Sequence, residues 1–164
     1  MNLKSTLLVV KDMDASKAFY AEVLGLSVEQ DFGANVTLTG GLCLQTESSW
    51  KEFISADSVT FGGCDSEIYF EEEKYDEFLE RISSLPQISF VHPPLEHRWG
   101  QRVCRIYDLD CHILEIAEPL SAVIRRFAGD GMSCEEISKR MDIPLETVTK
   151  ELQLPHIRHS EEPT

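Results

Sequence analysis

The order of the predicted strands and helices constrains this chain most, because the same order occurs twice. A first set comprises an apolar strand, an amphipathic helix and three short strands, at residues 7–10, 15–23, 27–31, 35–38 and 42–46. A second set repeats that order at residues 67–70, 75–82, 88–91, 102–107 and 112–117. Two units of the order βαβββ predict an α+β fold in which paired modules share one sheet architecture.

The rest of the chain is predicted to be helical. Ser133 and Glu136 form a capping box that opens one of three short helices, and the spacing of these helices resembles a helix-turn-helix. We therefore expect a first domain at residues 1–118, a short C-terminal helical, helix-turn-helix-like extension at residues 119–154 and a flexible tail at residues 155–164.

The chain is strongly acidic, which disfavours binding to nucleic acid. Its 164 residues include 15 Lys and Arg against 29 Asp and Glu, for a net charge of −14. The candidate recognition helix in the extension carries only Lys150 against Glu146 and Glu151. Contacts to phosphates need cations that this helix lacks, so we expect no nucleic-acid partner.

The apolar runs and the cysteines indicate the compartment. Runs such as Leu7–Val10 are much shorter than the ~20 residues that a membrane helix needs. The five cysteines are odd in number and form no Cys-x-x-Cys pair, which predicts reduced, mostly buried thiols. We expect a soluble cytoplasmic protein without membrane contact.

Two segments carry a family resemblance. The first reads LLVVKDMDASKAFY at residues 7–20, followed by VLGL at 23–26; the second reads WGQR at 99–102 and YDLDCHILEI at 107–116. Over residues 3–118 the chain resembles the vicinal oxygen chelate superfamily, which includes glyoxalase I, bleomycin and fosfomycin resistance proteins and extradiol dioxygenases. The chain departs from the usual turn at Leu109 and Cys111, where members commonly carry Pro and Gly.

The resemblance implies a divalent metal held at four positions in a cup of sheet, two from each unit. The matching positions are Ser5, Gln45 (or Leu44, if the alignment shifts by one residue), Glu67 and Glu115. Of these, only Glu115 is the residue commonly seen. Serine is a poor ligand for a borderline metal, so the implied ligands here are Gln45, Glu67 and Glu115. A site without metal is the equal alternative.

Strand alternation places each carboxylate among apolar or aromatic neighbours. Glu115 shares a face with Ile113 and Ala117, and Glu67 shares a face with Tyr69. Converging there, Glu67 and Glu115 are the candidate catalytic residues, because they can hold a hard cation or share a proton. The alternative is that both are partly solvated acids at strand ends.

Four further residues are candidates for substrate binding. They would supply an aromatic wall, a cationic clamp, a residue in the crossover between the units and a neighbour of Glu67, and they are Trp99, Arg102, Trp50 and Tyr69.

Two functions follow from the resemblance. One is a metal-dependent lyase or isomerase of the glyoxalase type acting on a small polar metabolite. The other is a metal-free protein that sequesters a small molecule, as the bleomycin resistance members do, and the serine at the first metal position favours it. A dioxygenase is disfavoured, because the matched positions hold no histidine. The resemblance also implies a homodimer, because members commonly complete their cups by pairing modules.

Overall fold

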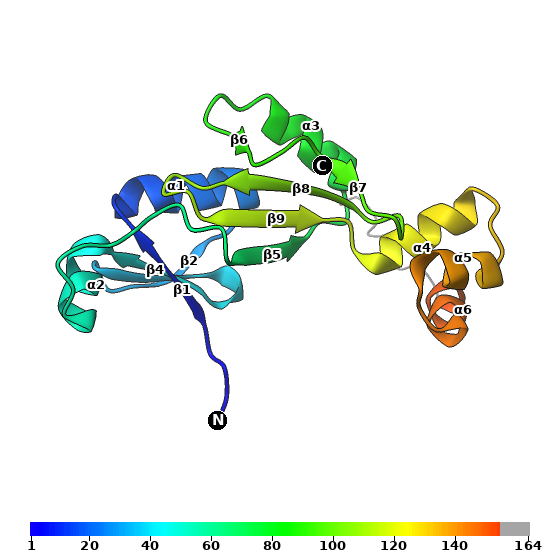
Figure 1. Ribbon diagram of the computed structural model, residues 1–164, viewed down its shortest axis with the longest axis horizontal. Coiled ribbons are helices and arrows are strands. Elements are labelled where there is room, and N and C mark those ends of the chain that lie inside the picture. The colour runs from blue at the N-terminus through cyan, green and yellow to red at the C-terminus, as the bar shows by residue number, and fades with distance from the viewer. Residues whose placement is uncertain (155–164) are drawn as a thin grey trace, which may run out of the picture.

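In the structure, a computed structural model that describes residues 1–154, each predicted βαβββ unit forms its own sheet (Figure 1). The first unit consists of β1 (Thr6–Val10), α1 (Met13–Leu24), β2 (Val28–Asp31), β3 (Asn35–Leu38) and β4 (Leu42–Thr46), with a 3₁₀ turn at Thr39–Gly41 before β4. The second consists of β5 (Glu67–Glu71), α3 (Tyr75–Ser83), β6 (Ser89–Phe90), β7 (Leu95–Glu96), β8 (Arg102–Tyr107) and β9 (Ile113–Ala117). The predicted α+β fold with a doubled unit is confirmed.

The two sheets have the same topology. Their strand orders are β1-β4-β3-β2 and β5-β9-β8-β6, and the short β7 adds a second pairing to β8. In each sheet the first strand runs parallel to the last, and the other neighbours are antiparallel. The first strand of each unit, β1 or β5, is therefore an edge strand of its sheet.

Helix α1 begins and ends where its sequence dictates. The Asp12 side chain accepts a hydrogen bond from the backbone of Ala15 at 3.0 Å, which satisfies a donor that the first turn leaves free. Gly25 ends the helix at φ 67°, a left-handed conformation that costs glycine little. The same motif sets the direction in which the chain leaves for β2.

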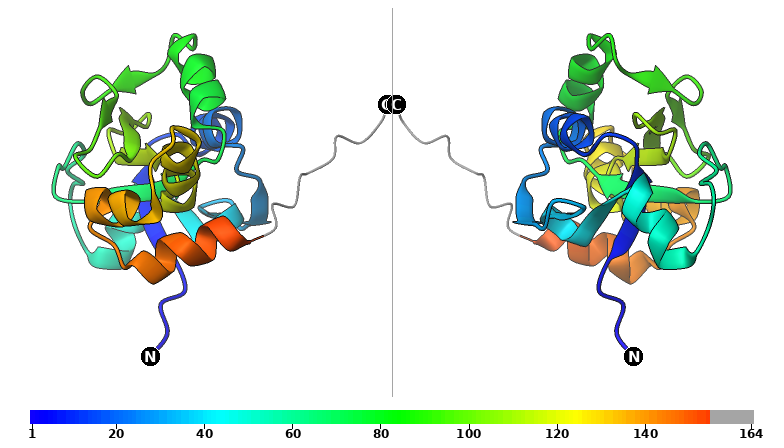
Figure 2. Two further views of the ribbon diagram at one scale, coloured as in Figure 1. Left: turned by 90° about the vertical axis from the view of Figure 1, so that its right-hand side faces the viewer. Right: turned by 90° about the vertical axis from the view of Figure 1, so that its left-hand side faces the viewer.

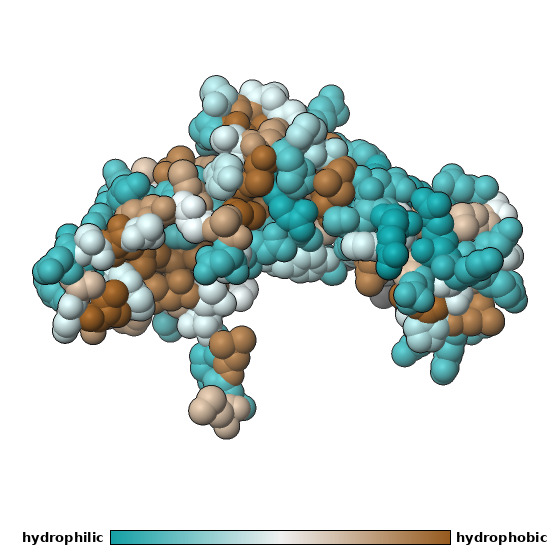
Figure 3. All heavy atoms as spheres, viewed as in Figure 1, coloured by the Kyte–Doolittle hydropathy of each residue, from teal (hydrophilic) through white to brown (hydrophobic). Residues whose placement is uncertain are grey.

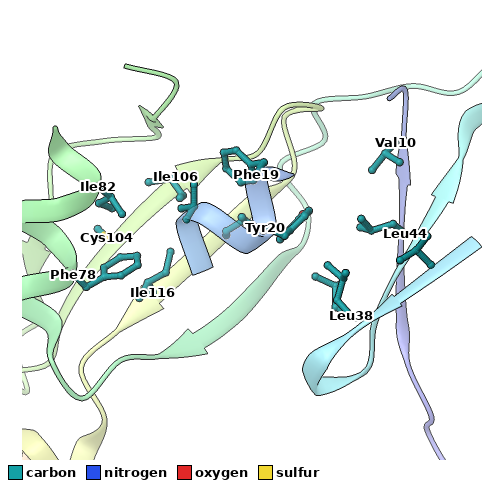
Figure 4. Packing of buried hydrophobic residues seen from close by; sticks show 14 of the residues in the cluster. Val10, Phe19, Tyr20, Leu38, Leu44, Phe78, Ile82, Cys104, Ile106 and Ile116 are labelled. Carbon is teal, nitrogen blue, oxygen red and sulfur yellow. The ribbon is translucent and has the colours of Figure 1, made fainter. Parts of the chain in front are cut away.

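One apolar core joins the two units, and α1 lies at its centre (Figure 4). Phe19 and Tyr20 of α1 lie between Leu44 of the first sheet and Ile106 and Ile116 of the second. All five side chains are at most 4% exposed. Because one face of each sheet packs against this helix, the opposite faces of the two sheets are not part of this core.

A buried polar group also joins the units. The Tyr20 hydroxyl donates to Asp108 in the β8–β9 turn at 2.8 Å, and the His112 ring binds the same carboxylate oxygen at 2.8 Å. Burial would raise the pKa of Asp108, but its hydrogen bonds with His112 and Tyr20 outweigh burial and lower it. The carboxylate thus stays ionised and fixes the turn that precedes β9.

The crossover between the units contains a helix that is not among the predicted elements. Helix α2 (Glu47–Ile54) follows β4 and packs against β4 and β1. Trp50, Phe53 and Ile54 have the spacing of one helical face, and Lys51 pairs with Glu47 at 3.5 Å one turn away. These i, i+3 and i+4 relations are the signal that identifies the helix.

The extension forms three helices, α4 (Leu120–Gly129), α5 (Cys134–Met141) and α6 (Leu145–Gln153). They enclose a small core of their own, made of Val123, Ile124, Phe127, Ile137, Met141 and Val148. The predicted capping box of Ser133 and Glu136 is present. Residues 155–164, predicted to form a flexible tail, lie outside the described residues. Figure 1 shows the extension at one end of the molecule, and Figure 2 shows the N-terminal segment projecting away from both sheets.

Apolar and hydrophilic side chains occupy different parts of the surface. In Figure 3 apolar side chains gather over the first unit, whereas the face over the extension is mostly hydrophilic. Phe32, between β2 and β3 of the first unit, is 72% exposed, and Phe53, on α2 in the crossover, is 71% exposed. Within residues 1–154, no helix has the length and apolarity that crossing a bilayer requires.

Candidate functional site

The open face of the second sheet carries a row of polar side chains. On β5, Ile68 and Phe70 pack against the core, so Glu67 and Tyr69 point the other way and are exposed. Strand pairing sets Tyr69 beside Glu115 of β9 and sets Glu115 beside Arg105 of β8. Residues paired across a sheet share a face, so Tyr69, Glu115 and Arg105 form one row across three strands. We call this surface the open face.

Arg105 joins the two candidate catalytic carboxylates. Its Nε donates to Glu67 Oε2 at 2.8 Å, and its Nη2 forms an ion pair with Glu115 Oε2. The exposed fractions of the three side chains are 22% for Arg105, 8% for Glu115 and 38% for Glu67. One guanidinium thus separates two acids that would otherwise repel one another.

A second chain of hydrogen bonds runs beside this group. Trp99 Nε1 donates to Gln101 Oε1 at 3.1 Å, Gln101 Nε2 donates to the Tyr69 hydroxyl at 3.2 Å, and that hydroxyl donates to Glu71 at 3.0 Å. Partial burial and the Glu71 carboxylate raise the pKa of Tyr69, and the bond from Gln101 partly offsets them. The phenol therefore stays protonated and keeps a hydrogen to donate.

His97 stacks on Trp99 at the end of this chain. Their ring centroids are 4.2 Å apart and their planes differ by 13°. Burial lowers the pKa of His97, and the positive charge of Arg105 lowers it further. A neutral imidazole and an indole thus border the polar row with a flat aromatic surface.

Tyr69 of the open face also lines a cavity between the units. The cavity is about 700 Å³ and is lined by the start of β1, the turn before β4 and the far half of β5, including Ser5, Tyr69 and Glu71. A smaller pocket of about 190 Å³ lies at the other end of β5 and includes Glu67 and His112. Both cavities follow β5, whose outer edge has no strand partner in the sheet. Small-molecule sites commonly measure about 300–1,000 Å³, so the larger cavity suits a ligand.

Four of the predicted site residues come together here, namely Glu67, Glu115, Tyr69 and Trp99. Ser5, the residue at the first matched position, lines the same cavity as Tyr69. The convergence of Glu67 and Glu115 follows from the parallel pairing of β5 with β9.

The other predicted residues lie elsewhere. Gln45 is 1% exposed beneath α2, where it bonds to Asn35 and Ser49. The one-residue alternative, Leu44, points into the core. Trp50 lies half-buried on α2, in the crossover between the units. Within residues 1–154, the structure records no hydrogen bond or ion pair between these side chains and the row of Tyr69, Glu115 and Arg105.

Arg102 is on the opposite face of β8 from Arg105. Its guanidinium binds Glu118 at 3.0 and 3.1 Å and Asp76 at 2.7 Å, and it lies over the Tyr75 ring of α3. Alternation along a strand explains the difference, because residues 102 and 105 are separated by an odd number of positions. Arg102, the predicted cationic clamp, therefore forms its ion pairs at the junction with the extension and does not lie on the open face.

Sequence reasoning misses Arg105, although a signal exists. Strands β8 and β9 form a hairpin in which Tyr107 opposes Ile113, and counting back from that pair sets Arg105 opposite Glu115. The predicted strand ends at 102–107 and 112–117 would have given this pairing within one residue, but a one-residue slip moves every side chain to the other face.

The arrangement does not fit a divalent metal as the family holds it. Of the three implied ligands, Gln45 is hydrogen-bonded to other side chains. Glu67 is hydrogen-bonded to the Arg105 guanidinium, and Glu115 forms an ion pair with it. Within the described part of the chain, no group of three or more His, Cys, Asp and Glu side chains is placed to hold a metal ion. A cation between the carboxylates would have to displace Arg105.

Comparison with known proteins agrees with this fold. The sequence profile of the family described as the glyoxalase-like domain matches residues 3–121. A protein of unknown function from Agrobacterium tumefaciens, solved by crystallography, is 33% identical, with a TM-score of 0.65, over 72% of this chain and 94% of that one.

Two further solved structures share the fold at lower identity. A glyoxalase-related enzyme from Fulvimarina pelagi is 19% identical, with a TM-score of 0.63, over 73% of this chain and 89% of that one. A lactoylglutathione lyase from Agrobacterium tumefaciens is 24% identical, with a TM-score of 0.58, over 73% of this chain and 94% of that one. The comparison with curated proteins gives no match. The chain belongs to the glyoxalase-like domain family, within the vicinal oxygen chelate superfamily whose motifs it carries.

Proposed function

We propose that this glyoxalase-like protein binds a small polar molecule on the open face of its second sheet and in the adjoining cavity. The observation that carries the proposal is the hydrogen-bonded chain from Trp99 through Gln101 to Tyr69, which ends at the 700 Å³ cavity. A few fixed polar groups beside an aromatic surface are the usual composition of a small-molecule site. The proposal favours the binding, sequestering type of family member.

Metal-dependent lyase or isomerase chemistry is the second candidate. Glu67 and Glu115 occupy matched metal positions and lie on one face, but a metal there would have to displace Arg105, so this candidate stands second. A carboxylate there could move a proton next to a carbonyl. Elemental analysis of protein purified without a histidine tag separates the two candidates, because stoichiometric metal supports the second and its absence supports the first.

A homodimer is part of the proposal. Val28 and Phe32 of the first unit and Phe53 and Ile54 of α2 are exposed apolar side chains, and among the described strands β1 and β5 each leave one edge unpaired. Light scattering at micromolar concentration should give twice the chain mass of 18.6 kDa. A monomer mass would contradict the dimer. All five cysteines are free thiols, which supports the cytoplasmic location expected from the sequence. The prediction that they are mostly buried is wrong, because only Cys43 and Cys104 are buried.

Binding can be measured through Trp99 itself. The chain has two tryptophans, so Trp50→Phe leaves Trp99 as the only indole, and its fluorescence should respond to small amides and hydroxyketones. Adding Tyr69→Phe should weaken the response. The matched control is Tyr75→Phe, which removes the phenol of the first residue of α3, on the opposite face of the sheet. Equal responses of the two phenol variants, or no response to any compound, would contradict the proposal.

A further inference from the structure

Arg105 provides a permanent positive charge between the carboxylates at two matched metal positions. Its Nε and Nη2 each hold one carboxylate, and both contacts involve the Oε2 atoms. The group comes from three adjacent strands of a rigid sheet, so its position does not depend on a loop. A metal ion in the family's cup would likewise neutralise acids and present a positive charge to the substrate.

We propose that Arg105 takes the place of the metal, so that this protein binds its ligand without a metal ion. Arginine suits this role because its guanidinium stays charged at all physiological pH values and binds carboxylates in a fixed geometry. Two carboxylates and one guanidinium leave a net charge of −1, whereas a divalent ion would leave zero. The charge presented to the ligand therefore differs from that of a metal centre.

The atoms left free define the class of ligand, and this step rests on the proposed function. Within residues 1–154, Arg105 Nη1, Glu67 Oε1 and Glu115 Oε1 take part in no recorded hydrogen bond or ion pair, and Glu115 Oε2 is paired with Arg105 without a hydrogen bond. Glu67 is 38% exposed and Glu115 only 8%, so the donor and acceptor that a ligand can reach are Arg105 Nη1 and Glu67 Oε1. A ligand oxygen would accept from Arg105, and a ligand N–H or O–H would donate to Glu67. The net charge of −1 on the group and −14 on the chain opposes anions. The complementary ligand is neutral and combines a carbonyl with a nearby donor, as an amide does.

The metal part of the proposal is tested with the full chain and metal alone. Wild-type protein should purify without stoichiometric metal, and its melting temperature should not respond to MnCl₂. Arg105→Met leaves two unneutralised carboxylates, so it should melt lower than wild type and recover several degrees with MnCl₂. Adding Glu115→Gln should remove that recovery. Arg98→Met, which removes an exposed arginine on the loop before β8, is the matched control and should behave as wild type.

Two results would overturn the replacement of the metal. One is stoichiometric metal in wild-type protein, or a wild-type melting temperature that rises with MnCl₂ as much as that of Arg105→Met. The other is a folded Arg105→Met variant that does not respond to MnCl₂. If Arg105→Met fails to fold, Glu67→Gln with Glu115→Gln serves instead: it removes both carboxylates and should leave the absence of a MnCl₂ response unchanged, whereas a new response would contradict the proposal.

The ligand part is tested with benzamide, acetophenone and benzoate in calorimetric titrations. Benzamide offers a carbonyl and a donor, acetophenone offers only the carbonyl, and benzoate carries a negative charge. Benzamide should bind at least about tenfold more tightly than either, and Arg105→Met should remove this preference. Tighter binding of benzoate would overturn the ligand class. If none of the three binds, the ligand class and the proposed function fail, while the metal measurements still decide the role of Arg105.

Discussion

Phe127 of α4 packs directly against the backbone of Gly100, at the point where the extension meets the second sheet. A Cβ atom added to Gly100 would lie 2.1 Å from Cζ of the Phe127 ring, and Gly100 has a φ of 92°. The Arg126 guanidinium also donates to the Gly100 carbonyl oxygen. The extension is thus fitted to the second unit at a position that tolerates only glycine.

Gly100→Ala should destabilise the protein by roughly 2–3 kcal/mol, because it combines a steric clash with an unfavourable φ. The matched control is Gly129→Ala at the end of α4, where an added Cβ meets nothing within 4 Å. The control should change stability by less than about 1 kcal/mol, in the stabilising direction. Urea denaturation measures both. Similar values for the two variants would show that the contact between Phe127 and Gly100 is loose.

Glu118 should make the stability of this junction depend on pH. The side chain is 4% exposed and forms ion pairs with Arg102 at 3.0 Å and Arg126 at 3.1 Å. Burial alone would raise the pKa of Glu118, but the hydrogen bonds from both arginines outweigh it and hold the pKa below its ordinary value of 4.5. The stabilisation is therefore complete above pH 4.5 and is lost as the pH falls through the lower, folded-state pKa.

Glu118→Gln tests this dependence. At neutral pH it should lower the free energy of unfolding by roughly 2 kcal/mol, because two arginines lose a charged partner. The difference from wild type should shrink in acid. Glu77→Gln, at an exposed residue paired with Lys74, is the control and should have little effect at any pH. A difference that stays constant down to acidic pH would contradict the assignment.

Gln45 should matter for folding and not for binding. Its buried amide bonds to Asn35 at 2.7 Å and to Ser49 of α2. Gln45→Leu leaves these partners without their bonds, so it should cost roughly 1–3 kcal/mol of stability. Because Gln45 is not part of the open face, the affinity for benzamide should stay as in wild type. Loss of that affinity in a folded variant would show that Gln45 is part of the binding site and would contradict this prediction.

The sequence predicts the fold well because its signals are local. Alternating apolar residues identify the strands at Asn35–Leu38, Leu42–Thr46 and Arg102–Tyr107 with the bounds that the structure gives. Asp12 and Gly25 mark helix ends through hydrogen bonds and φ angles that only nearby residues decide. Helix α2 is not predicted, because its one apolar face is short and mostly exposed.

The site is harder to predict because it depends on contacts between strands. The family motif supplies Glu67 and Glu115, and the pairing of β5 with β9 brings them together. Whether these acids face a metal or a guanidinium depends on Arg105, whose face is set by the register of the β8–β9 hairpin. Arg102, three positions earlier, has the same chemistry but serves Glu118. Sequence alone does not show which of the two arginines faces Glu67 and Glu115.

Calorimetric titration of benzamide before and after treatment with EDTA tests the central claim most directly, because Arg105 is part of the chain and a chelator cannot remove it. We predict the same affinity in wild-type protein with and without EDTA, and at least about tenfold weaker binding in Arg105→Met under both conditions. An affinity that EDTA abolishes and MnCl₂ restores in the wild type would contradict the account.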